Sequence, residues 1–93
     1  MANLRFEWDA DKSRKNRAKH GISFEDAVSA FGDLNSITID DIDRSSHEDR
    51  FITIGSTQRQ VVVVVSHTDR SGVIRIISAR RANREERKQY YAL

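Results

Sequence analysis

The 93-residue sequence contains no cysteine and no proline, and it has only four glycines. Without cysteine, neither a disulfide framework nor a thiolate metal site can form, so a reducing compartment is the natural setting. No apolar run approaches the roughly 20 residues that a membrane helix requires, and the N-terminus lacks the basic-then-apolar pattern of a signal peptide. We therefore expect a cytoplasmic protein that has no membrane partner.

A chain of this length predicts a single domain spanning residues 1–93. Hydrophobic periodicity indicates a strand near residues 4–8, helices at 10–20 and 23–32, strands at 37–39, 51–54, 61–65 and 73–79, and a final helix after residue 83. The run VVVVV at 61–65 shows no alternation, which is typical of a central strand covered on both faces. The order β-α-α-β-β-β-β-α predicts a small α+β domain with a mostly antiparallel sheet of four to five strands.

Local signals place the helix ends. Asp9 suits an N-cap, and the first helix is expected to end at Gly21, which tolerates left-handed geometry. A second helix should begin after Ser23. Asn83 with Glu86 three residues later has the spacing of a capping box and marks the change from strand to helix.

The net charge is only +2, but the charges are segregated along the chain. Residues 12–20 hold five lysines or arginines and a histidine with no acid, whereas residues 40–49 hold five acids and one arginine. Such segregation predicts one face that attracts polyanions and another that repels them. The alternative is that both runs are ordinary solvated faces.

The first helix is polar on all sides. Lys12, Asn16 and Lys19 stand at i, i+4 and i+7, and His20 lies beside them, so four donors share one face. This face either contacts phosphates or belongs to a helix that merely covers one edge of the sheet.

The segment 74–91 concentrates arginines at the end of a strand. Strict alternation would turn Ile74, Ile76, Ser78 and Arg80 to one side and Arg75, Ile77, Ala79 and Arg81 to the other. An arginine among β-branched neighbours needs an anionic partner, because an unpaired buried charge costs several kcal/mol, of order 3–5. That partner is either a carboxylate of Glu7, Glu48 or Asp49, or an anion brought by a ligand. The guanidinium fork binds phosphate bidentately and stacks on bases, so the cluster, with two tyrosines nearby, suits RNA.

Two motifs carry a family resemblance. The pattern Trp-x3-Lys-x3-Asn-x2-Lys-His-Gly falls on residues 8–21, and Arg-Ile-Ile-Ser-Ala-Arg falls on residues 75–80, with "EDRF" and "IG" between them at 48–55. In this order and spacing, over nearly the whole chain, the sequence resembles the BrnT family of type II toxins. Residues 41–47 match no family pattern and are expected to be a variable loop, and His67 lies outside the motifs.

The resemblance implies a RelE-like ribonuclease fold and an RNA-cleaving toxin that arrests translation. It also implies a cognate BrnA-like antitoxin that neutralises the toxin, supplies the DNA-binding part of the complex and represses the operon, with the toxin as a homodimer inside that complex. No cofactor is implied. The acidic run "DDID" shows no third ligand group beside it, so we expect no metal site.

Metal-free RNA cleavage uses the 2′-hydroxyl as nucleophile, and it needs a base, cations for the charge on phosphorus and an acid for the leaving oxygen. The candidates for charge stabilisation are Arg75, Arg80 and Arg50. Lys19 and His20 are the candidates for proton transfer, and Tyr91 is the candidate for orienting a nucleobase of the RNA. Of the two residue types proposed for proton transfer, only histidine changes its charge near neutral pH, although a histidine at a helix end is often only a cap. The expected RNA contacts are Lys12, Asn16, Ser78, Arg81, Arg84, Arg87 and Tyr90.

A second function class stays open on the residues alone. The alternative is a non-catalytic nucleic-acid- or protein-binding module whose basic face holds an acidic partner. Growth arrest by the protein alone, and its loss on replacing Arg80, would separate the two.

Overall fold

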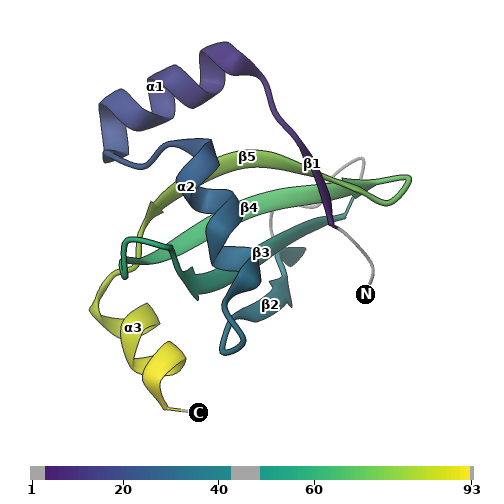
Figure 1. Ribbon diagram of the computed structural model, residues 1–93. Helices are drawn as coiled ribbons and strands as arrows, with labels where there is room; N and C mark the ends of the chain where they lie inside the picture. The colour runs from purple at the N-terminus through teal and green to yellow at the C-terminus, as the bar shows by residue number, and fades with distance from the viewer. Residues whose placement is uncertain (1–3, 43–48, 93) are drawn as a thin grey trace.

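The computed structural model describes residues 4–42 and 49–92, which form one mixed sheet and three α-helices (Figure 1). The strands are β1 (Arg5–Glu7), β2 (Ile37–Asp40), β3 (Arg50–Ser56), β4 (Val62–Arg70) and β5 (Val73–Arg81). The helices are α1 (Ala10–His20), α2 (Phe24–Ser29) and α3 (Arg84–Tyr91), and a 3-10 turn, η1 (Ala30–Gly32), continues α2. This architecture confirms the predicted α+β class and element order. Of the expected variable loop at 41–47, residues 43–47 lie outside the described residues.

The sheet has five strands in the order β1-β5-β4-β3-β2. β1 and β5 are parallel, whereas β5 with β4, β4 with β3, and β3 with β2 are antiparallel. The valine run leads into the central strand, as its lack of alternation predicted. β4 runs on to Arg70, well past the expected end, because the turn to β5 needs only Ser71 and Gly72, which have φ of 54° and 83°. Within the described ranges no helix is long and apolar enough to cross a membrane.

The predicted helix caps are present. The Asp9 carboxylate accepts hydrogen bonds from the backbone N–H groups of Asp11 and Lys12 at 2.9 and 3.1 Å. Gly21 ends α1 in the left-handed region with φ of 74°. Asn83 and Glu86 form the reciprocal capping box at the start of α3.

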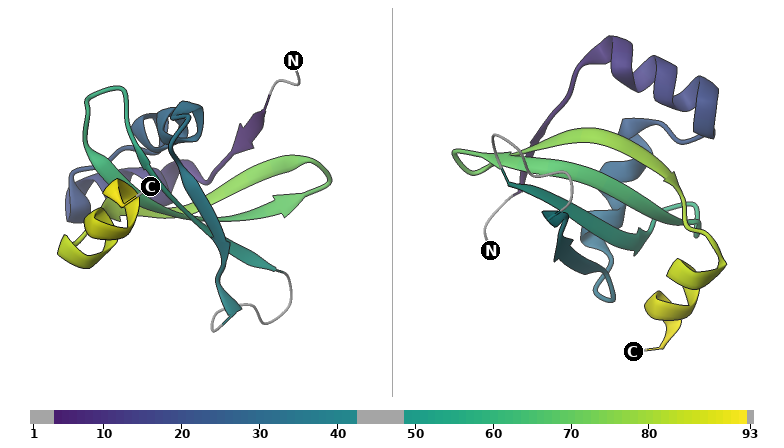
Figure 2. Two further views of the ribbon diagram at one scale, coloured as in Figure 1. Left: turned by 90° about the horizontal axis from the view of Figure 1, so that it is seen from below. Right: turned by 180° about the vertical axis from the view of Figure 1, so that it is seen from behind.

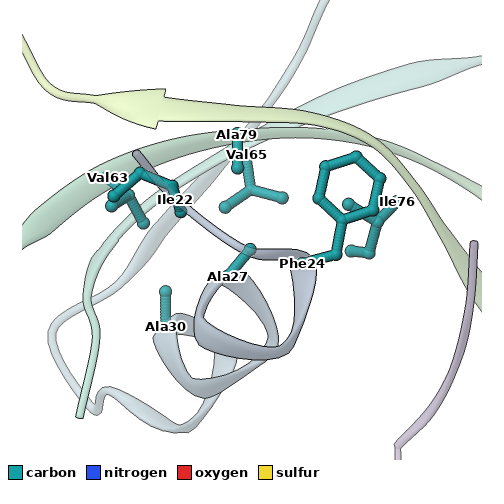
Figure 3. Close-up of a cluster of buried hydrophobic side chains, with 8 residues drawn as sticks. All are labelled: Ile22, Phe24, Ala27, Ala30, Val63, Val65, Ile76 and Ala79. Carbon is teal, nitrogen blue, oxygen red and sulfur yellow. The ribbon is translucent and has the colours of Figure 1, made fainter. Parts of the chain in front are cut away.

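The main core lies between the sheet and the segment formed by α2 and η1. Figure 3 shows its fully buried members, which are Ile22, Phe24, Ala27, Ala30, Val63, Val65, Ile76 and Ala79. The helix approaches the sheet closely at Gly55, where a Cβ atom would lie 2.7 Å from the Ala30 carbonyl oxygen. Only glycine fits there, and this close approach fixes how η1 crosses β3.

The opposite face of the sheet is covered at one end by α3. Seen from behind in Figure 2, the strands lie in front of α2, and α3 packs where β5 finishes. A smaller cluster of Ile54, Val62, Val64, Ala82 and Tyr90 is buried there. Tyr90, expected among the RNA contacts, is only 8% exposed and belongs to this core, so that expectation is corrected.

Tyr90 also anchors α3 through its hydroxyl, which donates to the Asp33 carboxylate. This hydrogen bond, helped by burial and by the charge of Asp33, raises the pKa of Tyr90 to about 12. Burial alone would raise the pKa of Asp33, but hydrogen bonds from Tyr90 and from the backbone of Ser56 and Asn35 outweigh it and lower that pKa. The pair holds the last helix against the loop before β2.

A β-bulge breaks the expected alternation in β5. Ser66 pairs with Ser78 while the next residue, His67, pairs with Ile76, so Ile77 is an extra residue without a cross-strand partner. As a result Ile76 and Ala79 both point into the main core. The predicted assignment of faces is therefore wrong beyond Ile77, since one inserted residue turns every later side chain to the other face.

Candidate functional site

The bulge brings the three arginines proposed for charge stabilisation onto one face of the sheet. The strand register defines three rows there, which are Arg50-Thr68-Arg75, Ile52-Ser66-Ser78 and Ile54-Val64-Arg80. Cross-strand partners in a sheet point the same way, so these rows share the face opposite α2. Strict alternation would have placed Arg75 and Arg80 on opposite faces.

A hollow of about 250 Å³ opens on this face. Its lining consists of Asp41, Ile52, Val64, Ser66, Ser78 and Arg80. The lining combines two apolar side chains with one cation, one carboxylate and two hydroxyls, which can neutralise and hydrogen-bond an anionic ligand that has an apolar part. Arg80 and Ser78 were expected here from the sequence.

Asp41 and Ser66 were missed by the sequence analysis. The N–H of Asp41 donates to the carbonyl of Arg50 at 2.8 Å, which continues the β2–β3 pairing by one residue and places Asp41 beside the hollow. The position of Asp41 directly after β2 was the available signal, but residues 41–47 had been interpreted as a variable loop. Ser66 faces Ser78 across the strands, which only the register reveals.

Arg80 is held in a fixed orientation by Glu86 of α3. The guanidinium Nη1 and Nη2 atoms lie 2.7 and 2.8 Å from the two carboxylate oxygens, which is the bidentate geometry of the strongest ion pairs. These hydrogen bonds raise the pKa of Arg80 and lower the pKa of Glu86. Glu86 also accepts from the Asn83 N–H at 2.8 Å, so one carboxylate both caps the helix and aims the arginine.

Arg75 has a looser partner. Its Nη1 atom lies 3.6 Å from the carboxylate of Glu7 on β1, one of the three acids that the sequence analysis had named. Glu7 and Arg75 are also register partners in the parallel β1–β5 pair. The contact is single and partly exposed, so it adds little stability and leaves most of the guanidinium donors available.

Asn16 has a structural position rather than the RNA contact that we expected. It is 8% exposed, its amide nitrogen donates to the carbonyls of Ile22 and Ala79 at 2.9 and 2.7 Å, and its amide oxygen accepts from the Ala79 N–H at 3.1 Å. The side chain thus imitates a neighbouring strand along the edge of β5 beyond β1. It holds α1 against the sheet, which explains how a helix with almost no apolar face is kept in place.

The remaining α1 residues do not line the hollow. Lys12 and Lys19 are exposed and His20 is partly buried. The hydrogen bonds of Asn16 hold α1 beside Ala79, so these three residues lie on a helix at the edge of β5. The RNA contact of Lys12 and the proton transfer by Lys19 or His20 stay predictions.

The arginines of the C-terminal segment gather elsewhere. Arg81, Arg87 and Tyr91 line a second hollow of about 220 Å³ between the start of β4 and α3, together with Gln60, Val61, Val62 and Ala82. Arg87 donates to the Ala82 carbonyl at 2.7 Å, and Arg84 and Tyr91 are exposed. These expected RNA-contacting residues therefore form a separate basic surface, and Tyr91 is not beside Arg80 in the first hollow.

His67 lies on the helix side of the sheet, away from the hollow. Its ring packs on Phe31 and Phe51 with centroids 4.9 and 5.8 Å away, and its Nε2 atom is 2.8 Å from the Thr53 hydroxyl. Burial, only partly offset by the charge of Asp69, lowers the pKa of His67 to about 4. The structure is thus consistent with leaving His67 out of the site.

This histidine predicts a loss of stability in mild acid. The pKa is about 4 in the folded state and close to the ordinary 6.5 when unfolded, so the unfolded chain binds more protons between these values. Stability should fall as the pH drops from 6.5 to 4, by up to about 3 kcal/mol from this group. Urea unfolding at several pH values should show this slope, and His67→Gln should flatten it. Equal slopes in both proteins would contradict the assignment.

Among residues 4–42 and 49–92, no group of three histidine or acidic side chains is placed to hold a metal ion.

Comparison with known proteins identifies related sequences and structures. The sequence model of the family described as "Ribonuclease toxin, BrnT, of type II toxin-antitoxin system" matches residues 8–86. The fold is similar to the crystal structure of the Brucella abortus ribonuclease toxin BrnT, with a TM-score of 0.68 and 24% sequence identity, over 88% of this chain and 100% of that one. A comparison with curated proteins gave no match.

Proposed function

Because the chain belongs to the BrnT family of ribonuclease toxins of type II toxin-antitoxin systems, we propose that it is a metal-independent endoribonuclease that stops translation. The observation that carries this proposal is the hollow beside Arg80. There a fixed guanidinium, two hydroxyls and a carboxylate converge on one place, as phosphodiester cleavage requires.

In the proposed reaction the 2′-oxygen of RNA attacks the adjacent phosphorus. Asp41 accepts the proton of the 2′-hydroxyl, the new oxygen–phosphorus bond forms, and the bond to the 5′ oxygen breaks. Arg80 stabilises the charge that grows on the phosphoryl oxygens, and Ser66 and Ser78 hydrogen-bond the substrate. Lys19 and His20 stay our candidates for the donor that protonates the leaving oxygen. The products are a 2′,3′-cyclic phosphate and a 5′-hydroxyl end.

The partners follow from the same proposal. A cognate antitoxin, BrnA-like and DNA-binding, would neutralise the toxin, and the toxin would act as a homodimer within their complex. The exposed cations of α1 and α3 provide the charge by which RNA is attracted. Phosphate contacts of this kind predict an RNA affinity that falls steeply with salt.

The test is to express the chain alone and together with the adjacent gene, and to map the RNA ends in both cultures. Alone it should slow growth and produce RNA fragments with 5′-hydroxyl ends, and the adjacent gene should suppress both effects. If the chain alone neither slows growth nor shortens RNA, the enzymatic proposal is wrong and a binding module is the better reading.

The choice of Asp41 as base predicts a separation of binding from cleavage. Asp41→Asn removes the proton acceptor but keeps the shape of the hollow, so we expect kcat to fall about 100-fold or more with RNA binding retained. Asp40→Asn is the matched control, because Asp40 does not line the hollow. His20→Gln should reduce kcat less. A large loss in His20→Gln with none in Asp41→Asn would transfer the role of base to the histidine.

A further inference from the structure

We propose that Thr68, with Arg50 and Arg75, forms a second phosphate subsite. It lies on the open face of the sheet, which is the face opposite α2, and it binds the phosphate next to the one cleaved beside Arg80. This inference rests on the proposed function and adds a residue that neither family motif contains.

The first observation is an unpaired hydroxyl. Thr68 is 1% exposed, and its Oγ1 atom has no hydrogen-bond partner in the described part of the chain. Leaving a buried hydroxyl unpaired costs free energy, and folded proteins seldom keep one without a use. Thr53, equally buried in the next strand, shows the usual arrangement, with bonds to Thr38 and His67 at 2.7 and 2.8 Å.

The second observation is what stands on either side of this hydroxyl. Thr68 pairs with Arg50 on β3 and with Arg75 on β5, so the three side chains project from one row on the open face. Two strand spacings separate the Cα atoms of the arginines by about 10 Å, which allows both long side chains to reach an anion above Thr68. Two guanidinium groups and a hydroxyl donor match the oxygens of one phosphodiester.

The arrangement leaves a route for the anion to enter. Arg75 is tied to Glu7 by the single contact of 3.6 Å, and Glu7 is 44% exposed in its side chain. Such an exposed pair is weak, so a phosphate can displace the carboxylate from Arg75. In this proposal the movement of Arg75, the β5 partner of Thr68, gives the anion access to the hydroxyl.

The position of this row relative to the hollow suits consecutive phosphates. Thr68 lies two residues from Ser66 along β4, about 7 Å for an extended strand. An extended single strand can span this step with one nucleotide, whose base would meet the apolar side chains of Ile52 and Val64. The open face would thus bind two neighbouring phosphates of one RNA strand.

The experiment measures binding of two non-cleavable 2′-O-methyl oligonucleotides by fluorescence anisotropy, one of eight nucleotides and one dinucleotide with a single phosphodiester. Thr68→Val keeps the shape and removes the hydroxyl, so we expect about 10-fold weaker binding of the longer ligand and no change for the dinucleotide. Its melting temperature should be equal to or above that of the wild type, because no hydrogen bond in the fold is lost. Thr68→Ser should restore the affinity.

Thr53→Val is the matched control. It removes a hydroxyl of equal burial that is hydrogen-bonded on the opposite face, so it should lower the melting temperature and leave RNA affinity unchanged. If Thr68→Val binds the longer ligand as tightly as the wild type, or loses stability as Thr53→Val does, the subsite is wrong while the proposed function stands. If the wild type binds neither oligonucleotide and cuts no RNA, the proposed function and the subsite fail together.

Discussion

Replacing Arg80 with alanine is expected to reduce RNA cleavage by about 100- to 1,000-fold, the usual effect of removing a group that stabilises charge in the transition state. Arg80 is the cation that lines the hollow, and the bidentate bond to Glu86 fixes it before substrate arrives. A fixed guanidinium needs no reorganisation when charge develops on the phosphoryl oxygens. Cleavage of a defined RNA by the purified protein, measured as kcat and KM, checks the prediction, and the effect should fall on kcat.

The fold should survive this substitution. The side chains of Arg80 and Glu86 are 44% and 20% exposed, and partly exposed ion pairs contribute at most about 1 kcal/mol. Arg84→Ala is the matched control, because Arg84 is an exposed arginine a few residues away that does not line the hollow. Arg80→Lys keeps the charge but loses the fork, so it should recover only part of the activity. Wild-type cleavage by Arg80→Ala would show that the hollow is not the reaction site.

Replacing Asn16 with aspartate is expected to have the largest effect on stability, a loss of about 3–5 kcal/mol. The substitution changes one atom type, but it removes both donors to the Ile22 and Ala79 carbonyls and places a carboxylate against those oxygens in a buried position. This is a large part of the roughly 5–15 kcal/mol that stabilises a small domain. Urea unfolding at pH 7 measures the change directly.

Asn35→Asp provides the comparison, since it is the same chemical change on an exposed residue. It should alter the free energy of unfolding by no more than about 0.5 kcal/mol. Equal stabilities of the two variants would mean that the Asn16 bonds do not hold α1 on the sheet. A milder effect is expected for Asn16→Gln, whose amide keeps the donors but has an extra methylene to accommodate.

The elements that could be predicted from the sequence are those set by neighbours in the chain. The caps at Asp9, Ser23 and Asn83 formed as expected, because a cap depends on a side chain and the N–H groups two or three residues later. The central position of the valine run followed from its uniform apolarity. The pairing of Arg75 with Glu7 was among the alternatives, since few acids were near enough in the expected sheet.

The errors arose where a distant segment decides a residue's surroundings. Polarity suggested that Asn16 and Tyr90 face solvent, yet both are buried because a partner far along the chain satisfies their polar groups. Asp41 was assigned to a variable loop, although its backbone hydrogen bond to Arg50 brings it to the hollow. Composition reports the character of a side chain and carries no information about such partners.

The sequence by itself determined the class of fold, the order of its helices and strands, and the family to which the chain belongs, because these depend on local periodicity and on motifs in register. Only the tertiary structure decided which arginines share a face. One unpaired residue at Ile77 shifts the β4–β5 register and so unites Arg50, Arg75 and Arg80 on the open side of the sheet. A bulge arises from how two strands fit one another, and no pattern within β5 alone specifies it.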